Sequence, residues 1–242
     1  MNEELKNLTI VTITYNDRFI NKTFLSYKEH IDNGVKLIVV NGGKVLERSL
    51  LELINKNNLT LIEEPDKGRY DALNKGIEKV KTKYFILVHA GDELLIKPKD
   101  MRVLIHKMDF EKLDIILGNQ YIDFYNKIRK HTVTFWKPWM LGFGAQPPHM
   151  PIIYKKQFVK SLVYDYSSNI IADHIYLSSL FNLKPKWTKS NHYHIKMLGG
   201  GVTSSGFKSF LIVSNEFRKE YGLLKALLMF FLRVPLKLIQ MF

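Results

Sequence analysis

The sequence predicts an α/β fold in which a mostly parallel, doubly wound sheet carries helices on both faces. Short apolar runs alternate with amphipathic stretches four times over roughly the first ninety residues. Each run is too short for a buried helix, and most of the breaks between elements contain Gly, Asn or Asp. A chain of 242 residues is long enough to bury a full core.

The first half of the chain supplies the regular part of this pattern. We expect strands at Leu8–Thr14, Val35–Val40, Leu59–Ile62 and Tyr84–Val88, with helices at Arg18–His30, at Leu46–Ile54 and just after Asp66. Asp66 is a candidate to cap its helix, and Leu73, Ile77 and Val80 recur at helical spacing on the buried face. The loops at 15–17, 41–43 and 89–92 should emerge at one edge of the sheet, where open α/β sheets bind ligands.

The second half has a looser pattern. We expect a helix at Met101–Met108, strands at Ile115–Leu117 and Tyr121–Tyr125, and an antiparallel strand at Ile128–Phe135. A loop rich in Pro, Gly and aromatic residues at Pro138–Pro151 is typical of a site lining. A helix at Ile171–Phe181, a strand at Lys186–His194 and a flexible joint at Gly199–Gly201 follow.

The charge balance indicates an anionic partner. Thirty-six Lys and Arg against 23 Asp and Glu give a net charge of +13 and a pI near 9.6. The excess is spread along the chain without a nucleic-acid signature, so we expect no nucleic acid among the partners. The chain has no cysteine, which excludes disulfides and thiolate metal sites and suits the cytosol. The polar N-terminus predicts no signal peptide.

The last twenty residues form a basic, strongly apolar tail. Leu223–Phe242 is interrupted by Lys225, Arg233, Pro235 and Lys237, and charges near the middle of a membrane span are costly. We therefore expect an amphipathic helix that lies on an anionic membrane surface. The alternative is a helix that packs on the domain or in an oligomer contact.

Four motifs together resemble family-2 glycosyltransferases with the GT-A fold, which has a Rossmann-type sheet. They are Ile13–Asn16, Val39–Gly43, Glu64–Gly76 and His89–Asp92, and the third is the longest and most specific. The resemblance is to small bacterial members that build surface polysaccharides. It implies a catalytic domain over residues 1–222, with a nucleotide-sugar-binding half at 1–100 and an acceptor half at 101–222, followed by the tail at 223–242.

The resemblance also implies a set of donor-binding residues. It places the nucleotide-sugar against Thr14, Tyr15, Asn16, Asn41, Asp66, Lys67, Asp71 and Gly91. Asn41 departs from the family, which usually has Asp there, and this leaves the identity of the nucleotide open. Asp71 has a second interpretation at nearly even odds, as an exposed ion pair with Lys75 one helical turn away.

Asp92 is the expected metal ligand, by the same resemblance. Negative charge develops on the leaving diphosphate, and Mn²⁺ or Mg²⁺ held by a carboxylate at a strand end would stabilise it. The family normally has an Asp-x-Asp-like pattern here, whereas this chain has His89-Ala90-Gly91-Asp92. Metal binding would then depend largely on the diphosphate and on water.

The acceptor half supplies the remaining candidates. The family places an Asp at the start of a helix below the acceptor, and Asp173 is the expected catalytic base, with Asp165 as the fallback and a helix-dipole role as the alternative. His149 and Trp139 are expected in the acceptor or sugar pocket, although a solvated His and a core Trp are the plainer interpretations. His192 and His194 lack a neighbouring carboxylate and do not make a zinc site.

The function predicted from these residues is inverting sugar transfer from a UDP- or GDP-linked donor. The acceptor would be lipid-linked or an oligosaccharide, at the cytoplasmic face of the cell membrane. A non-catalytic binding module with the same fold, or another nucleotide-sugar enzyme such as a nucleotidyltransferase, are the alternatives. The absence of a Gly-rich phosphate loop near the N-terminus disfavours the nucleotidyltransferase.

Overall fold

The computed structural model describes residues 3–48, 52, 59–124, 127–167, 170–199, 206–228 and 231. Most of the helix predicted at 46–54 lies outside these residues, as do position 125 of a predicted strand and positions 200–201 of the predicted joint. Only residues 223–228 and 231 of the tail are described, and residues 223–228 are helical.

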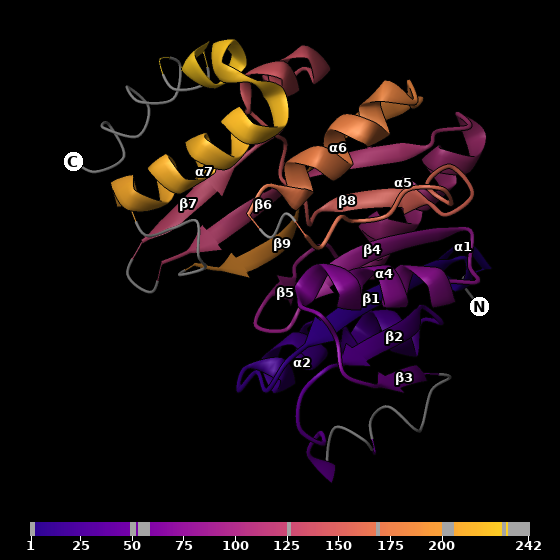
Figure 1. The fold of residues 1–242 in the computed structure, drawn as a ribbon. Coiled ribbons are helices and arrows are strands. Elements are labelled where there is room, and N and C mark those ends of the chain that lie inside the picture. The colour runs from indigo at the N-terminus through magenta and orange to yellow at the C-terminus, as the bar shows by residue number, and fades with distance from the viewer. Residues whose placement is uncertain are drawn as a thin grey trace.

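A single sheet of nine described strands runs through the molecule in the order β3-β2-β1-β4-β8-β6-β9-β5, with β7 paired to β6 (Figure 1). Its parallel part consists of β1 (Leu8–Thr14), β2 (Lys36–Asn41), β3 (Leu59–Glu63) and β4 (Tyr84–His89). Thr14 pairs with Asn41, and Ile13 pairs with His89, so these strands end side by side. The predicted edge with its three loops is confirmed.

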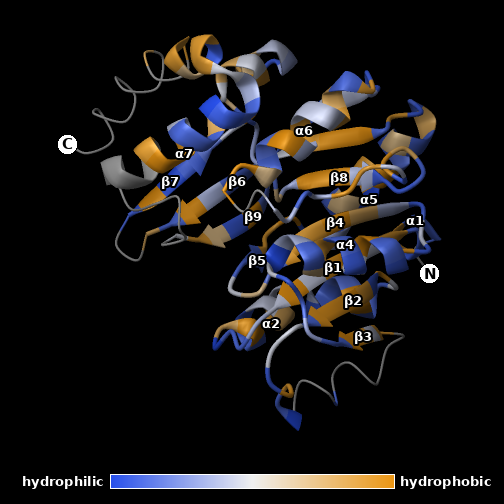
Figure 2. Ribbon diagram, in the orientation of Figure 1, coloured by the Kyte–Doolittle hydropathy of each residue, from blue (hydrophilic) through white to orange (hydrophobic). Residues whose placement is uncertain are grey.

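Helices α2 (Ile20–Asp32) and α4 (Arg69–Lys79) cover opposite faces of this parallel part. The Thr12 side chain meets the Tyr27 hydroxyl of α2 at 3.2 Å, whereas its neighbour Val11 faces α4. Adjacent residues of a strand point to opposite faces, so the two helices sandwich β1. A Cβ at Gly76 would lie 2.5 Å from Val11 Cγ1, so only glycine lets α4 approach this closely. Figure 2 shows the apolar strands between them.

The second half of the sheet mixes directions. β8 (Ile152–Lys155) is antiparallel to both β4 and β6 (Ile115–Asp123), β9 (Trp187–Leu198) is parallel to β6, and the two-residue β5 (Glu93–Leu94) is antiparallel to β9. The two strands predicted at 115–117 and 121–125 are one strand, because β9 pairs along it with a register shift at Asn119. β7 (Ile128–His131) is antiparallel as predicted but ends earlier.

The remaining helices are α1 (Glu3–Lys6), α5 (Pro98–Phe110), the 3₁₀ helix η1 (Pro138–Phe143), α6 (Ala172–Asn182) and α7 (Gly206–Tyr221). η1 lies inside the stretch predicted as a loop. Among the described residues, no helix combines the length and apolar character needed to cross a bilayer.

Candidate functional site

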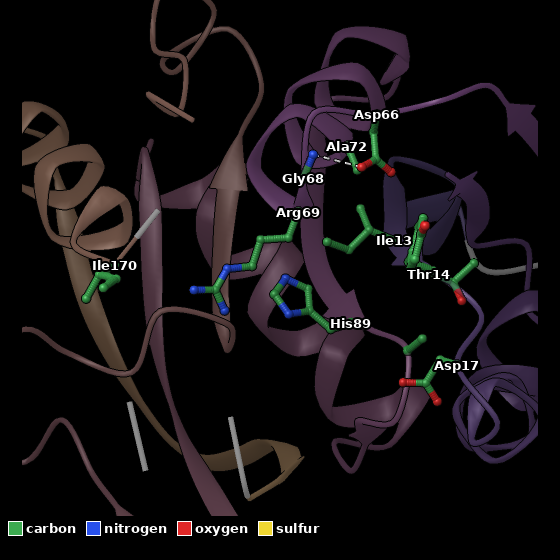
Figure 3. Close-up of a pocket in the computed structure, with 11 residues that line it drawn as sticks. Ile13, Thr14, Asp17, Asp66, Gly68, Arg69, Ala72, His89 and Ile170 are labelled. Carbon is green, nitrogen blue, oxygen red and sulfur yellow. Dashed lines mark hydrogen bonds between the residues drawn. The ribbon is translucent and has the colours of Figure 1, made fainter. Parts of the chain in front are cut away.

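A pocket of about 720 Å³ opens where β1 and β4 end (Figure 3). One wall comes from the end of β1 and the other from the start of α4. His89, the last residue of β4, and Ala90 after it also line the pocket, and Ile170 reaches across from the segment before α6. Its lining residues are Ile13, Thr14, Tyr15, Asp17, Asp66, Gly68, Arg69, Ala72, His89, Ala90 and Ile170. Thr14, Tyr15 and Asp66 are the predicted site residues among them.

Asn16 and Asn41 shape the loops beside this pocket. Asn41 is buried, and its amide nitrogen donates to the Lys44 carbonyl at 2.9 Å while its oxygen accepts from the Gly43 N–H at 3.1 Å. Asn16 adopts a left-handed conformation with φ of +54°, and its side-chain oxygen accepts from the Lys44 N–H at 2.6 Å. Asn41 therefore holds the loop after β2 in shape, and Asn16 ties that loop to the loop after β1.

Asp66 joins the start of α4 to the loop after β2. The sequence-based prediction that Asp66 caps this helix is wrong: the cap position is Gly68, whose N–H donates to Asp66 Oδ1 at 2.8 Å in a turn before the helix. A Cβ at Gly42 would lie 1.7 Å from Asp66 Oδ2, so no larger residue fits there. Asp66 thus reaches the end of β2 only because position 42 is glycine.

Asp71 and Lys75 form the predicted ion pair and brace the turn before α4. Asp71 Oδ2 lies 3.4 Å from Lys75 Nζ and accepts from the Lys67 N–H at 2.9 Å. This N–H is the main factor that lowers the pKa of Asp71. Lys75 also donates to the Pro65 carbonyl at 2.7 Å. The Lys67 ammonium lies 5.6 Å from the ring centre of Tyr166.

Asp92 is buried behind the pocket, with 4% of its surface exposed. Its Oδ1 accepts from the Leu198 N–H at 3.1 Å, and its Oδ2 has no hydrogen-bond partner in the described part of the chain. Burial and then the charge of Asp17 raise the pKa of Asp92 to about 7. Gly91, with φ of +94°, donates its N–H to Thr23 Oγ1 at 2.8 Å and lies outside the pocket lining.

The side chains around Asp92 can supply only part of the ligand set of a divalent cation. Within the described ranges, no three acidic, histidine or cysteine side chains gather closely enough to hold a metal ion. The unpartnered Oδ2 of Asp92 is one suitable oxygen ligand. Mg²⁺ commonly keeps several waters and is held by one or two carboxylates together with substrate phosphates. The residues fit a cation that a diphosphate brings with it, rather than a pre-formed metal site.

Sequence reasoning missed Arg69 and His89, which extend into the pocket side by side (Figure 3). Burial lowers the pKa of His89 to about 4, so the imidazole is neutral at pH 7, and its Nε2 is buried without a partner among the described residues. Both residues lie within the motifs that the sequence singled out. Their positions, at the end of a strand and in the first turn of a helix, were the signal that could have identified them.

Asp173 begins α6 and lies in a second cluster of titratable groups. His149 Nδ1 is 3.7 Å from Asp173 Oδ1, and the Asp173 charge adds to burial in raising the pKa of Tyr70. The Tyr70 hydroxyl is buried, and it lies close enough to Asp173 for a hydrogen bond between them to contribute to this shift. The same charge acts on the pKa of His89, which places this cluster next to the pocket. The carboxylate of the fallback base Asp165 instead accepts hydrogen bonds from the N–H and the hydroxyl of Ser167.

The other candidates of the second half lie away from the pocket lining. His149 is buried, with 6% of its surface exposed, and Trp139 is 66% exposed on η1. Trp136 packs in the core against Phe181. His194 is fully buried between the Pro151 carbonyl and the Ser190 hydroxyl, which makes it structural.

Comparison with known proteins gives a family and a fold. The profile of the family described as glycosyl transferase family 2 matches residues 9–171. A search of curated protein sequences finds no match. Among solved structures, S. aureus TarS residues 1–349 in complex with UDP aligns with a TM-score of 0.64 at 12% identity, over 88% of this chain and 64% of that one.

The mannosyltransferase PcManGT from Pyrobaculum calidifontis, solved with GDP-Man and Mn²⁺, aligns with a TM-score of 0.57 at 13% identity, over 88% of this chain and 64% of the other. This chain therefore spans just under two thirds of TarS residues 1–349 and of PcManGT, and 39% of the longer TarS structure. At such low identity the likeness concerns the fold, and it confirms the predicted GT-A architecture.

Proposed function

The chain belongs to glycosyl transferase family 2, and from this premise we propose that it moves a sugar, with inversion, from a nucleotide-sugar to a lipid-linked or oligosaccharide acceptor. The observation that carries the proposal is the pocket at the ends of β1 and β4, with the Asp173 cluster next to it. Ligand sites of open α/β sheets lie at this edge, and the volume is in the range of nucleotide sites.

The donor would lie with its nucleotide against the β1 and α4 walls. Asp66 and the loop after β1, which Asn16 ties to the loop after β2, form the side of the pocket, and the Arg69 guanidinium extends into it. A guanidinium is suited to bind a diphosphate through paired hydrogen bonds. Structures of similar fold contain UDP, UDP-GlcNAc or GDP-Man, which supports a uridine or guanosine donor.

Asp92 would offer Oδ2 to Mn²⁺ or Mg²⁺ that arrives with the diphosphate. When bound, the cation would neutralise charge on the leaving phosphate. Because the pKa of Asp92 is about 7, the carboxyl must lose a proton to act as a ligand, so metal-dependent binding should strengthen between pH 6 and 8.

Asp173 would act as the base. The acceptor hydroxyl oxygen bonds to the anomeric carbon as the bond from that carbon to the diphosphate oxygen breaks, and the hydroxyl proton passes to the Asp173 carboxylate. Attack from the side opposite the diphosphate inverts the anomeric centre. The position of Asp173 in the first turn of α6, close to Tyr70 of α4 and to His89, supports this arrangement.

The test is donor turnover followed by NMR, with water or a candidate acceptor. With UDP-GlcNAc or GDP-Man, whose sugars are α-linked to the diphosphate, the first-formed product should have the β configuration. A first-formed product that keeps the α configuration contradicts inversion. Donor binding without any turnover, across a panel of acceptors, would favour the non-catalytic module instead.

The same proposal places the enzyme at the cytoplasmic face of the membrane, where it would contribute to surface polysaccharide. α7 packs on α6 through His174, whose ring centre is 5.2 Å from that of Phe217, and through Ser178, which accepts from the Tyr221 hydroxyl at 3.4 Å. Trp136, just before η1, packs on Phe181 of α6. Residues 174, 178 and 181 share one helix face, so α7 and the segment before η1 lie on the same side of α6. The tail residue Ala226 packs against Phe217 of α7.

This side carries exposed apolar groups and basic groups together. Leu224 is 73% exposed and Phe231 70% exposed in the tail, and Trp139 is 66% exposed on η1. Lys137 and Lys225 accompany them. Apolar and cationic side chains on one surface suit an anionic bilayer.

Vesicle sedimentation tests this surface. We expect binding to phosphatidylglycerol-containing vesicles, and Leu224→Asp should weaken it roughly tenfold, since a buried leucine contributes about 1.5–3 kcal/mol. Val103→Asp is the matched control, because Val103 is 61% exposed on α5. Equal loss in both variants, or equal binding to vesicles of phosphatidylcholine alone, would contradict the membrane assignment.

A further inference from the structure

His149 is a buried imidazole that the proposed chemistry leaves without a role. It lies outside the pocket lining, with Nδ1 3.7 Å from Asp173 Oδ1 and Nε2 hydrogen-bonded to the Tyr164 hydroxyl. Its two ring nitrogens therefore face two different partners, one of which is the proposed base. A histidine that reaches only other side chains can act through the group that it orients.

The environment determines which nitrogen carries the proton. Burial is the main factor that lowers the pKa of His149, so the ring is neutral at pH 7 and has a single N–H. Burial also raises the pKa of Tyr164, which keeps its hydroxyl protonated and able to donate. If Tyr164 donates to Nε2, the ring N–H is at Nδ1 and points to the carboxylate. The opposite tautomer would set a lone pair of Nδ1 against the Asp173 oxygen, which is repulsive.

Tyr164 is held firmly enough to fix this tautomer. Its ring stacks on Tyr176 with centres 3.9 Å apart. Its backbone N–H donates to Asn74 Oδ1 at 2.8 Å, and its carbonyl accepts from Asn74 Nδ2 at 2.8 Å. Asn74 belongs to α4, whose first turn lines the pocket. The contacts therefore run from the pocket wall through Tyr164 and His149 to Asp173.

We propose that Tyr164 and His149 are positioning residues that orient Asp173 as the base, with neutral His149 donating its Nδ1–H to one carboxylate oxygen and leaving the other to the acceptor. The inference rests on the proposed function. The distance of 3.7 Å is longer than a hydrogen bond, and catalytic hydrogen bonds often tighten only when substrate binds. When Asp173 takes up the acceptor proton, no proton needs to leave His149.

Two substitutions at position 149 separate this role from simple packing. In His149→Asn the side-chain nitrogen falls near the position of Nδ1, and in His149→Gln it falls near Nε2. We measure release of UDP from UDP-GlcNAc or of GDP from GDP-Man, with water as acceptor, and donor affinity in parallel. The His149→Gln enzyme should lose about 10–100-fold in kcat, as is common for residues that orient a functional group, with donor affinity unchanged. The His149→Asn enzyme should keep most of its kcat.

The pH profile is the second readout. Loss of an N–H donor to the carboxylate should raise the pKa seen on the acidic limb of kcat in His149→Gln, because the charged form of Asp173 loses stabilisation. The other groups near this pair are Arg69, whose charge lowers the pKa of His149, and His89, which interacts with the charge of His149. Tyr70 also faces Asp173. Tyr164→Phe keeps the stacking and both bonds to Asn74, and it should shift the profile in the same direction by less.

Several results would overturn the inference. Equal kcat in His149→Asn and His149→Gln, a loss confined to donor affinity, or an unmoved pH profile each contradict it. In the Asp173→Asn background, His149→Gln should not lower kcat any further. If it lowers kcat there by as much as it does in the wild type, the positioning role is contradicted. If either histidine variant fails to fold, the pH profile of kcat in Tyr164→Phe tests the inference in its place. Full activity of Asp173→Asn itself would refute the base assignment, whereas an inactive Asp173→Asn with a fully active His149→Gln would refute only the positioning role.

Discussion

Asp92 and Asp173 sit in different surroundings, although both are carboxylates that the sequence singled out. Asp92 is 4% exposed, and within the described ranges Leu198 donates to one of its oxygens while the other has no hydrogen-bond partner. It is protonated to a large extent near neutral pH because burial raises its pKa to about 7. The Asp173 side chain is 31% exposed and faces His149 and Tyr70. Environment of this kind is what assigns different chemistry to two carboxyl groups in one site.

The carboxylates at the rim of the pocket have surroundings that differ from those of both Asp92 and Asp173. Asp66 and Asp71 accept backbone N–H groups at 2.8 and 2.9 Å, so they hold the turn before α4 in shape. Among the described residues, the pocket residues Thr14 and His89 each have a buried polar atom without a hydrogen-bond partner, Oγ1 and Nε2, and an unmade hydrogen bond costs free energy. The rim is satisfied by the protein itself, whereas the interior has capacity left for a ligand.

The largest expected effect comes from Asp173→Asn. Removal of a general base typically costs about 10²–10⁴-fold in rate, so donor hydrolysis should fall by that factor. Donor affinity should stay within about twofold, since Asp173 is not in the pocket lining. Steady-state kinetics and calorimetry on the same preparation measure both. A variant that loses affinity and rate together would place Asp173 in the donor site instead.

The next largest effect is expected on the thermal stability of Asp92→Asn. In the unfolded chain Asp92 loses its proton near pH 3.8, whereas in the folded protein it does so near pH 7, so the native enzyme loses stability as the pH rises between these values. The full difference is about 4 kcal/mol, or about 8–16 °C in Tm for a chain of this size. The Tm of Asp92→Asn minus that of wild type should therefore increase from pH 4.5 to pH 8. A constant difference would contradict the buried, protonated carboxyl.

Asp71→Asn should have the smallest effect. Its lowered pKa means that its contribution to stability is present at neutral pH and is lost as the pH falls below about 4. The variant should lose about 1 kcal/mol or less, because the ion pair with Lys75 is partly exposed. Nucleotide affinity should change little. A tenfold loss of affinity with an unchanged Tm would show that Asp71 contacts the donor, as the family resemblance implies.

The contrast between the halves of the sheet also explains what the sequence could predict. β1, β2 and β4 are continuous apolar runs, and parallel pairing brings their ends together, so the loops at 15–17, 41–43 and 89–92 could be placed at one edge. β8 has four residues and β5 only two, and both exist through antiparallel pairing with distant strands. No local pattern encodes such pairing.

The same limit applies to predicting the site from the sequence. The motifs predicted the right segments, and Thr14, Tyr15 and Asp66 do line the pocket. The roles of single side chains depend on distant partners that periodicity cannot supply. The Leu198 N–H donates to one carboxylate oxygen of Asp92, although the two residues are more than a hundred positions apart. His149 lies next to Asp173, although it belongs to another segment.

The most direct measurement is calorimetric titration of UDP and GDP, with and without Mn²⁺, into wild type, Arg69→Ala and Lys79→Ala. Arg69 extends into the pocket from the first turn of α4, and Lys79 is an exposed residue in the last turn of the same helix. We predict binding of at least one nucleotide to wild type and Lys79→Ala, and roughly tenfold weaker binding to Arg69→Ala, since a bond to a charged group contributes about 1.5–3 kcal/mol. Equal affinity in all three proteins, or no binding to any, would contradict the donor site proposed at the ends of β1 and β4.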